Sequence, residues 1–377
     1  MRPDRRSKPT FGGGDPSIPT TPPGGVLVKT LYGGICRSDL HIIIDELDLG
    51  RGQTFRQSEV LGMEAFQQTV LGHEICGVIK DIGSDVKESE LHLGDRVLVY
   101  PWIGCGKCKD CQVGDSQICL HNESGTTEIG QRPDLPGGFG DHVVVPNWRH
   151  VIPLPSNIPP SVACTLPCGA MTAYHALKQA TDAVSRAAAV HGKARMLILG
   201  QGGLGIWCLQ LARKVFHIQP LQITVGDVSK EKIEQATALG ADRAIHWSST
   251  DSVDHVINLL TSQGQQEFDV AIDFVGNPLT NGAGLGVLRK GGSMVAVGLA
   301  GGEMRMPIAG LVARSLRVQG VRVAPLYMLR ELLHLVASGG VAAPPITEYK
   351  LEDINQALDK LRRGELPGRA VVCHDRA

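Results

Sequence analysis

The sequence predicts an α/β chain with a β-rich half and a half built on a doubly wound parallel sheet. Between residues 26 and 155, short apolar stretches with branched side chains alternate with glycine turns, which is typical of strands. After Cys168 the pattern becomes strand, glycine turn and helix, repeated along the chain, which indicates a parallel sheet covered on both faces. The length of 377 residues accommodates both halves as separate domains.

In the first half, the apolar stretches predict strands, and they read VLVKTLYGG, EICGVIKDIG, DRVLVYPWIG and GGFGDHVVVP. Residues 43–70 show no clear period, and we interpret them as a long surface loop with one helical turn. Residues 1–25 are rich in proline, glycine and charge, so they are predicted to form a disordered N-terminal arm.

In the second half, strand–helix pairs are predicted for ARMLILGQGGLGIWCLQLARKVF and LQITVGDVSKEKIEQATALGA, after a helix at MTAYHALKQA. Three further short strands are expected at FDVAIDFVG, GGSMVAVGLAG and SLRVQGVRV. The chain is then expected to end with two amphipathic helices, MLRELLHLVASGG and LEDINQALDKLRRG, and a strand, GRAVVCH.

Charge and hydropathy exclude several classes of partner. With 37 Lys and Arg against 38 Asp and Glu, the chain has no electrostatic signature for nucleic acid or for an anionic membrane. No uninterrupted apolar run reaches the length of a membrane span, and the first ten residues lack the apolar core of a secretory signal. Their basic residues fit a solvated tail better than a weak transit peptide. We therefore expect a cytoplasmic protein with reduced cysteines, where crowded cysteines favour metal over disulfides.

Four of the ten cysteines lie within fifteen residues, in the stretch CGKCKDCQVGDSQIC. Zinc prefers a tetrahedron of thiolates, and a closed four-thiolate site has no position for a substrate. The spacing therefore predicts a structural zinc held by Cys105, Cys108, Cys111 and Cys119. Unmetallated thiols, a disulfide pair and an iron–sulfur cluster are the alternatives.

Three other potential ligands are dispersed along the chain: Cys36 in GGICRSDLH, His73 in VLGHEICG and Cys168 in TLPCGAMTAY. Each is unremarkable alone, since a single cysteine or histidine near glycine is more often a packed core or surface residue. Together they would give zinc two thiolates and one imidazole, with a fourth position open for water or substrate. Cys164, four residues before Cys168, competes with it for this role.

These motifs, with LPCGAMTAY, GQGGLG and GRAVV, occur in an order that resembles the zinc-dependent medium-chain alcohol dehydrogenases over roughly residues 24–377. The resemblance implies a GroES-like catalytic domain and a Rossmann NAD-binding domain. It implies two zinc ions per subunit and a small alcohol or carbonyl substrate. It also implies a homodimer or homotetramer. The expected boundaries are 26–172 with 323–377 for the catalytic domain, its zinc lobe at about 100–120, and 173–322 for the cofactor domain.

The resemblance also implies roles for residues around the dispersed ligands. Cys36, His73 and Cys168 match the catalytic zinc ligands, and Glu74 matches a carboxylate beside the zinc that acts as an alternate ligand. Asp39 matches the residue that hydrogen-bonds the ligand histidine. Two further residues, Ser38 and His41, match a relay that carries the substrate proton to solvent through the cofactor ribose. A surface histidine is the alternative for His41, and Arg37 matches a contact to the cofactor pyrophosphate.

The stretch LILGQGGLG predicts the cofactor site. Gly200, Gly202 and Gly205 form G-x-G-x-x-G between a predicted strand and a predicted helix, and Gly203 lies among them. Asp227 follows about twenty residues on, where an acid accepts hydrogen bonds from the ribose and disfavours the 2′-phosphate of NADP. NAD is therefore the expected cofactor. By resemblance, Lys232 contacts the same ribose and Arg369 the pyrophosphate; solvated charges are their alternatives.

Two departures from the family pattern concern the N-terminus and the mouth of the site. A Pro/Gly arm stands where the family usually has an extra strand pair, and the stretch 45–68 makes the interval between Cys36 and His73 unusually long. Trp102 is interpreted as a wall of the substrate pocket or as a core residue. For the function of the whole chain, the alternatives to an alcohol dehydrogenase are a polyol or amino-alcohol dehydrogenase, a carbonyl reductase of the same family, or a zinc-stabilised NAD-binding protein without turnover.

Overall fold

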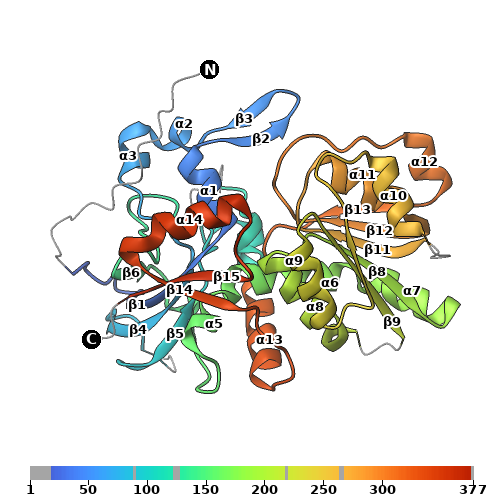
Figure 1. Cartoon of the computed structure of the whole chain (residues 1–377). Helices are drawn as coiled ribbons and strands as arrows, with labels where there is room; N and C mark the ends of the chain where they lie inside the picture. The colour runs from blue at the N-terminus through green and yellow to red at the C-terminus, as the bar shows by residue number, and fades with distance from the viewer. Residues whose placement is uncertain (1–17, 88–90, 122–127, 217–219, 263–266, 375–377) are drawn as a thin grey trace. The chain divides into compact units, whose positions relative to one another are not determined.

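The computed structural model describes residues 18–87, 91–121, 128–216, 220–262 and 267–374, which divide into two compact units (Figure 1). The first unit comprises residues 1–46, 56–167 and 346–377, and the second comprises residues 47–55 and 168–345. In the described part of the chain, no helix combines the length and the apolar character of a membrane span.

The first unit is built on a mixed sheet in the order β14-β15-β1-β4-β5-β7, with β6 also paired to β1. Its strands are β1 (Val26–Ile35), β4 (Glu74–Ile82), β5 (Arg96–Val99), β6 (His142–Val145), β7 (Val151–Pro153), β14 (Ile346–Lys350) and β15 (Arg369–Cys373). Its α-helices are α1 (Arg37–Ile44), α2 (Gln57–Leu61), α3 (Met63–Gln67), α4 (Lys109–Gln112), α5 (Pro160–Ala163) and α14 (Ile354–Arg363).

Strand β1 organises this unit because it pairs with β15, β4 and β6. The alternate residues Val26 and Val28 are fully buried in a cluster with Ile75 and Val97, as a strand with one face on a core requires. Helix α14 covers a second cluster, in which Ile35 at the end of β1 contributes to the core. The end of β1 and the start of α1 are thereby fixed in place, and Cys36 lies between them.

The second unit contains a six-stranded parallel sheet in the order β10-β9-β8-β11-β12-β13, the doubly wound order expected for a dinucleotide-binding fold. The strands are β8 (Ala194–Leu199), β9 (Leu221–Asp227), β10 (Arg243–His246), β11 (Phe268–Asp273), β12 (Leu288–Ala296) and β13 (Arg317–Gly320). The helices are α6 (Met171–Gln179), α7 (Thr181–His191), α8 (Gly203–Val215), α9 (Lys230–Ala238), α10 (Val253–Thr261), α11 (Pro278–Gly286), α12 (Ile308–Ala313) and α13 (Leu326–Ala337).

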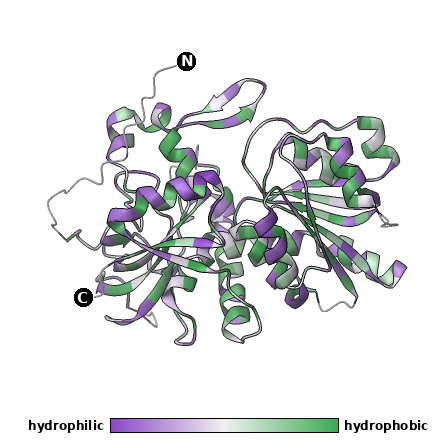
Figure 2. Cartoon of the chain, viewed as in Figure 1, coloured by the Kyte–Doolittle hydropathy of each residue, from purple (hydrophilic) through white to green (hydrophobic). Residues whose placement is uncertain are grey.

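Both faces of this sheet are covered. Leu197 and Leu199 of β8 pack into a cluster with residues of α10 and α11, while the alternate residues Met196 and Ile198 are equally buried. Because successive side chains of a strand point to opposite faces, each face of β8 has a core against it. Figure 2 shows hydrophobic residues along the strands at the centre of this sheet. The α/β fold class predicted from the sequence is confirmed.

The stretch 43–70 is more structured than the surface loop predicted from the sequence. It contains a hairpin of β2 (Leu47–Gly50) and β3 (Gln53–Phe55), followed by α2 and α3. The hairpin belongs to the second unit, where the Arg51 backbone N–H donates to the Glu303 carboxylate at 2.6 Å. The prediction failed because contacts distant in sequence, not local propensity, hold these short elements.

The N-terminal arm is also partly ordered. Residues 1–17 lie outside the described residues, but the backbone of residues 22–25 is hydrogen-bonded to the first unit. Trp148 donates to the Gly24 carbonyl at 3.0 Å, and Gly83 donates to the Gly25 carbonyl at 3.0 Å. The structure therefore differs from the predicted disorder at residues 22–25, because backbone hydrogen bonds to residues distant in sequence hold them.

Candidate active site

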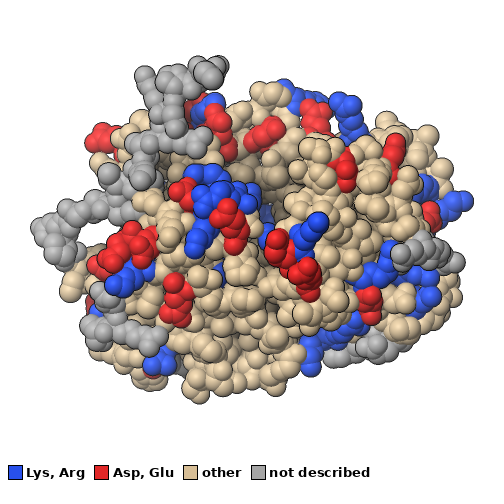
Figure 3. Space-filling model, in the orientation of Figure 1, with Lys and Arg blue, Asp and Glu red and all other residues tan. Residues whose placement is uncertain are grey.

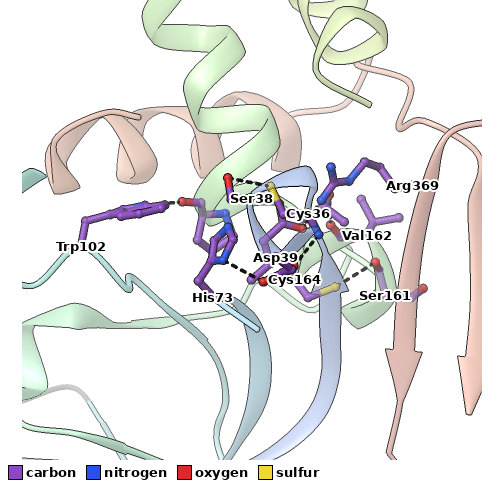
Figure 4. A network of polar contacts seen from close by, with 12 residues as sticks. Cys36, Ser38, Asp39, His73, Trp102, Ser161, Val162, Cys164 and Arg369 are labelled. Carbon is purple, nitrogen blue, oxygen red and sulfur yellow. Dashed lines mark hydrogen bonds and ion pairs between the residues drawn. The ribbon is translucent and has the colours of Figure 1, made fainter. Parts of the chain in front are cut away.

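Cys36 occupies the junction between β1 and α1. Its extended backbone (φ −110°, ψ 155°) makes it the N-cap of α1, and its buried backbone N–H donates to the Asp39 carboxylate at 2.8 Å. The helix therefore begins with a fixed turn that places the Cys36 thiol and the Asp39 carboxylate on neighbouring positions (Figure 4). Both side chains are buried, with Cys36 5% and Asp39 0% exposed.

His73 directly precedes β4 and is fully buried. Its Nδ1 faces the Asp39 carboxylate at 3.5 Å, and its Nε2 has no hydrogen-bond partner among the described residues. Burial is the strongest single influence and disfavours the imidazolium, but Asp39 and Cys36 together oppose it and raise the pKa of His73 well above its ordinary value. A buried nitrogen left without a partner beside two thiols fits a metal ligand, with Asp39 fixing the ring.

Glu74 is the first residue of β4 and is fully buried. It forms an ion pair with Arg369 of β15, while its Oε1 has no hydrogen-bond partner among the described residues. Burial raises the pKa of Glu74 to about 7, although the Arg369 charge acts in the opposite direction. Gly34 makes room for this carboxylate, because a Cβ at position 34 would overlap it. A carboxylate oxygen is therefore available beside the thiols.

Cys168 completes the cluster at the point where the chain passes from the first unit to the second. It lies in a single π-helical turn, Leu166–Ala170, and one potential ligand atom from each of Cys36, His73, Glu74 and Cys168 lies within 4.8 Å of the others. π-Helical turns are rare, and those that do occur are often found at functional sites. Cys164 instead directs its thiol to the Ser161 carbonyl at 3.3 Å. Two thiols, an imidazole and a carboxylate are a donor set that zinc accepts.

The two residues of the predicted proton relay lie on α1. The Ser38 hydroxyl is 3.7 Å from the Cys36 sulfur, and His41 is half-buried in the same short helix. Burial and the neighbouring Arg37 charge lower the pKa of His41 below its ordinary value. The imidazole is therefore neutral at neutral pH and able to accept a proton.

The four-cysteine lobe is a local structure around α4. Its sulfurs lie 4.0 Å apart for Cys105 and Cys111 and 3.8 Å apart for Cys108 and Cys119. Two sulfurs bound tetrahedrally to one zinc are about 3.8 Å apart, since each Zn–S bond is about 2.3 Å. Gly104 has φ +60°, and a Cβ there would lie 2.6 Å from the Cys111 sulfur, so only glycine suits this turn.

Backbone amides stabilise negative charge on this lobe. Cys105 accepts from the backbone N–H groups of Lys107 and Cys108, both at 3.4 Å, and they lower the pKa of the Cys105 thiol to about 6. The Cys105 N–H in turn donates to the Cys119 sulfur at 3.3 Å. These donors favour a thiolate at Cys105, whereas burial raises the pKa of the Cys111 thiol to about 12.

The predicted cofactor loop connects β8 to α8 at the carboxyl edge of the parallel sheet. Gly205 packs so closely on the Gly200 carbonyl that no side chain fits there, whereas the Cα of Gly202 faces open space. Asp227 ends β9 and accepts hydrogen bonds from the backbone N–H groups of Gln201 (2.7 Å) and Ser229 (2.9 Å). This open cradle at a helix N-terminus, beside a buried carboxylate, fits a dinucleotide.

The remaining predicted cofactor residues have other partners here. Arg37 is exposed and donates to the Leu361 carbonyl at 3.5 Å, and Arg369 is buried against Glu74. The Lys232 backbone N–H donates to the Ser229 hydroxyl at 3.3 Å at the start of α9. Their cofactor roles therefore stay predictions.

The sequence pattern gave little indication of the structural importance of two residues in the site region. The Trp102 ring packs beside His73 with 5.4 Å between ring centroids. Asp273 ends β11, is fully buried, and accepts from the backbone N–H groups of Val275 and Gly276 at 2.8 and 3.1 Å. The position of Asp273 near the end of an apolar stretch, with Gly276 three residues later, was the available signal.

Comparison with known proteins identifies both parts of the chain. Residues 22–156 match the alcohol dehydrogenase GroES-like domain, and residues 203–338 match the zinc-binding dehydrogenase family. The chain is 32% identical to an NAD-dependent alcohol dehydrogenase of Sulfolobus acidocaldarius over 95% of this chain and 94% of that protein.

Solved structures give the same result. An alcohol dehydrogenase from Aeropyrum pernix is 31% identical, with a TM-score of 0.76 and coverage of 96% of both chains. An acetophenone reductase from Geotrichum candidum, solved in complex with NAD, is 25% identical with a TM-score of 0.75, over 95% of this chain and 92% of that one.

Proposed function

Because the chain belongs to the zinc-dependent medium-chain alcohol dehydrogenase family, we propose that its buried cluster is the site of hydride exchange between a small alcohol or carbonyl compound and NAD(H). The chain is an NAD-dependent, zinc-containing oxidoreductase. The observation that carries the assignment of the site is the convergence of Cys36, His73 and Cys168, with the Nε2 of His73 left without a partner in the described structure.

We propose that Cys36, His73 and Cys168 hold the catalytic zinc. A zinc ion bound there supplies a Lewis acid that polarises the substrate oxygen. Asp39 lies 3.5 Å from Nδ1 of His73, where it would favour a proton on Nδ1 and leave Nε2 as the ligand atom. Glu74 provides an alternate ligand and keeps the charge of Arg369 beside the site.

Ser38 and His41 are proposed to carry the substrate proton away from the site. Ser38 adjoins the Cys36 sulfur, and the lowered pKa of His41 leaves a neutral acceptor three residues farther along α1. The Ser38 hydroxyl can both accept and donate, so it passes a proton on without holding charge. The cofactor ribose is expected to connect the two.

The cofactor loop is proposed to bind NAD, which accepts or donates the hydride. Gly200, Gly202, Gly203 and Gly205 allow the pyrophosphate to approach the N-terminus of α8. Each Asp227 oxygen that now accepts one backbone N–H retains capacity for a ribose hydroxyl. Arg37, Lys232 and Arg369 are proposed to contact the pyrophosphate or the ribose, as the family resemblance implies.

The cysteine lobe is proposed to hold a second, structural zinc, which gives two per subunit.

We further propose a cytoplasmic homodimer or homotetramer, with domains at 26–172 plus 323–377 and at 173–322. The exposed edge strand β13 supports assembly, as do Ile308 (79% exposed) and Val312 (70% exposed) of α12. Sedimentation analysis measures the subunit number, and a monomer would contradict this part. Figure 3 shows Lys and Arg beside Asp and Glu on the viewed face.

Carbonyl reduction is a second candidate for the main direction of the reaction, favoured by the 25% identity to an acetophenone reductase. Polyol and amino-alcohol substrates use the same chemistry, so only a panel separates them. NADH absorbance should be followed with primary, secondary and polyhydric alcohols, aldehydes and ketones, with zinc content measured in parallel. Turnover that requires about two zinc ions per chain supports the proposal. NADH binding without turnover on any substrate would leave the non-catalytic alternative.

A further inference from the structure

Trp102 follows β5 and connects three parts of the first unit. Its ring packs beside His73, with 5.4 Å between centroids and planes inclined by 55°. Its indole N–H donates to the Pro167 carbonyl at 3.0 Å, and its own carbonyl accepts from the Ser116 hydroxyl at 2.7 Å (Figure 4 shows the ring beside His73). The side chain is 4% exposed.

We propose that Trp102 is a positioning residue that holds two ligands of the catalytic metal site and connects that site to the four-cysteine lobe. The inference rests on the proposed ligand set of Cys36, His73 and Cys168. It assigns Trp102 a role that depends on its N–H donor, in addition to the volume of its ring.

The hydrogen bond to Pro167 bears directly on Cys168. Pro167 and Cys168 are neighbours in the π-helical turn Leu166–Ala170, where the regular ladder of helical hydrogen bonds is interrupted. The indole supplies a donor to a carbonyl of this turn from outside the helix. Fixing the Pro167 carbonyl fixes the peptide plane that leads into Cys168, and hence the position of its thiol.

The ring contact limits the motion of His73. Asp39 faces one ring nitrogen of His73 at 3.5 Å, and the Trp102 ring lies against the same imidazole. A tilted aromatic pair prefers a defined geometry, so the indole opposes rotation of the imidazole about its own axis. Trp102 therefore helps to hold two ligands that are distant in sequence.

The third contact reaches the lobe. Ser116 precedes the ligand Cys119, and its hydroxyl donates to the Trp102 carbonyl, while Trp102 itself lies just before Cys105. A small metal lobe loses structure when its ion leaves, because the ligands then repel or drift apart. Loss of metal from the lobe is therefore expected to loosen Trp102, and with it the catalytic ligands.

The test is Trp102→Phe in the full-length cobalt-substituted protein, which removes the N–H donor and keeps an aromatic ring. Cobalt bound by thiolates absorbs in the visible range, so its release to a chelator can be followed at each site separately. We expect release from the catalytic site to be about tenfold faster, with a changed band shape, and release from the lobe to be unchanged.

Trp247→Phe is the matched control, since Trp247 is 2% exposed and its indole nitrogen has no partner among the described residues. It should release cobalt like the wild type. If Trp102→Phe folds poorly, β-(3-benzothienyl)alanine at position 102 replaces the N–H by sulfur in a ring of nearly the same shape. Release of catalytic-site cobalt at the wild-type rate from Trp102→Phe, or from the benzothienylalanine variant, would overturn the proposal. Equally accelerated release from both metal sites would overturn it too. A wild type that binds cobalt only in the lobe would instead overturn the proposed catalytic ligands.

Ser116→Ala tests the connection to the lobe. It should accelerate release from the catalytic site in the wild-type background and have a smaller effect in the Trp102→Phe background, because the bridge is already broken there. Equal effects in both backgrounds would show that Ser116 and Trp102 act independently and would overturn the connection.

Discussion

The two cysteine clusters use the same ligand chemistry in opposite structural settings. The lobe takes its four sulfurs from residues 105–119, and three of these cysteines are only partly buried. The catalytic cluster takes its atoms from Cys36, His73, Glu74 and Cys168, all buried and supplied by three separate stretches of the chain. The comparison teaches that a metal can organise the lobe, whereas the fold must organise the catalytic cluster before any metal arrives.

The largest expected effect is that of Cys36→Ser, which breaks the catalytic cluster alone. Loss of the Lewis acid should lower kcat/KM by at least about 10³-fold, because several kcal/mol of transition-state stabilisation disappear. Zinc content should fall by about one ion while the unfolding midpoint stays nearly constant, since the fold already holds the ligands. Steady-state kinetics and metal analysis check this.

The matched control is Cys373→Ser, at a half-buried thiol that lies outside both clusters. It should retain both zinc ions and full activity. Full activity of Cys36→Ser would refute the ligand assignment.

Cys108→Ser tests the opposite case in the lobe. Because the metal is expected to hold this loop together, the free energy of unfolding should fall by at least about 2 kcal/mol, with one zinc lost. Denaturant unfolding followed by fluorescence measures the change. An unfolding free energy equal to that of the wild type would mean that the lobe is organised without its metal.

A pair of glycine substitutions sharpens the contrast. Gly34→Ala places a Cβ against the buried Glu74 carboxylate, so we expect a loss of about 1–3 kcal/mol from overpacking. Gly106→Ala in the lobe meets nothing within 4 Å and should cost only about 1 kcal/mol, the strain of φ +70°. Calorimetric unfolding of both variants measures the two losses of stability. A larger loss in Gly106→Ala than in Gly34→Ala would contradict the prediction.

The smallest expected effect on activity concerns the proton relay. Because the pKa of His41 is lowered, wild-type alcohol oxidation should decline only as the pH falls below the ordinary histidine range and the imidazole becomes protonated. His41→Gln should reduce kcat about tenfold at neutral pH and remove that acid limb. Profiles of kcat against pH give the answer, and an unchanged acid limb would exclude His41.

The sequence predicts the ligands better than their surroundings, for a physical reason. Cys36, His73 and Cys168 are marked by their chemistry, and the G-x-G-x-x-G stretch is marked by its strand and helix. The ion pair of Glu74 with Arg369 joins residues 295 positions apart, so no local pattern reveals it. The hairpin at 47–55 has too few residues for a period, and a contact to Glu303 holds it in place.

The partner of Trp102 could not be predicted for the same reason. Its N–H meets a carbonyl 65 residues away, in a π-helical turn that no propensity signals. Short strands such as β7 and β14 were missed because three to five residues carry little periodicity. Sequence patterns therefore identify which side chains do chemistry, and only tertiary contacts reveal what holds them.

The pairing of β1 with β15 has a consequence for how the chain is made. Residues Gly34 and Ile35 pair with Val371 and Ala370, so the first sheet needs the last strand to be translated. At ribosomal rates of about 5–20 residues per second, synthesis of residues 168–345 alone takes roughly 10–35 s, during which β1 waits for that neighbour. The second unit is thus free to fold while the nascent first unit is still incomplete, and Glu74 acquires its ion-pair partner only after Arg369 has been translated.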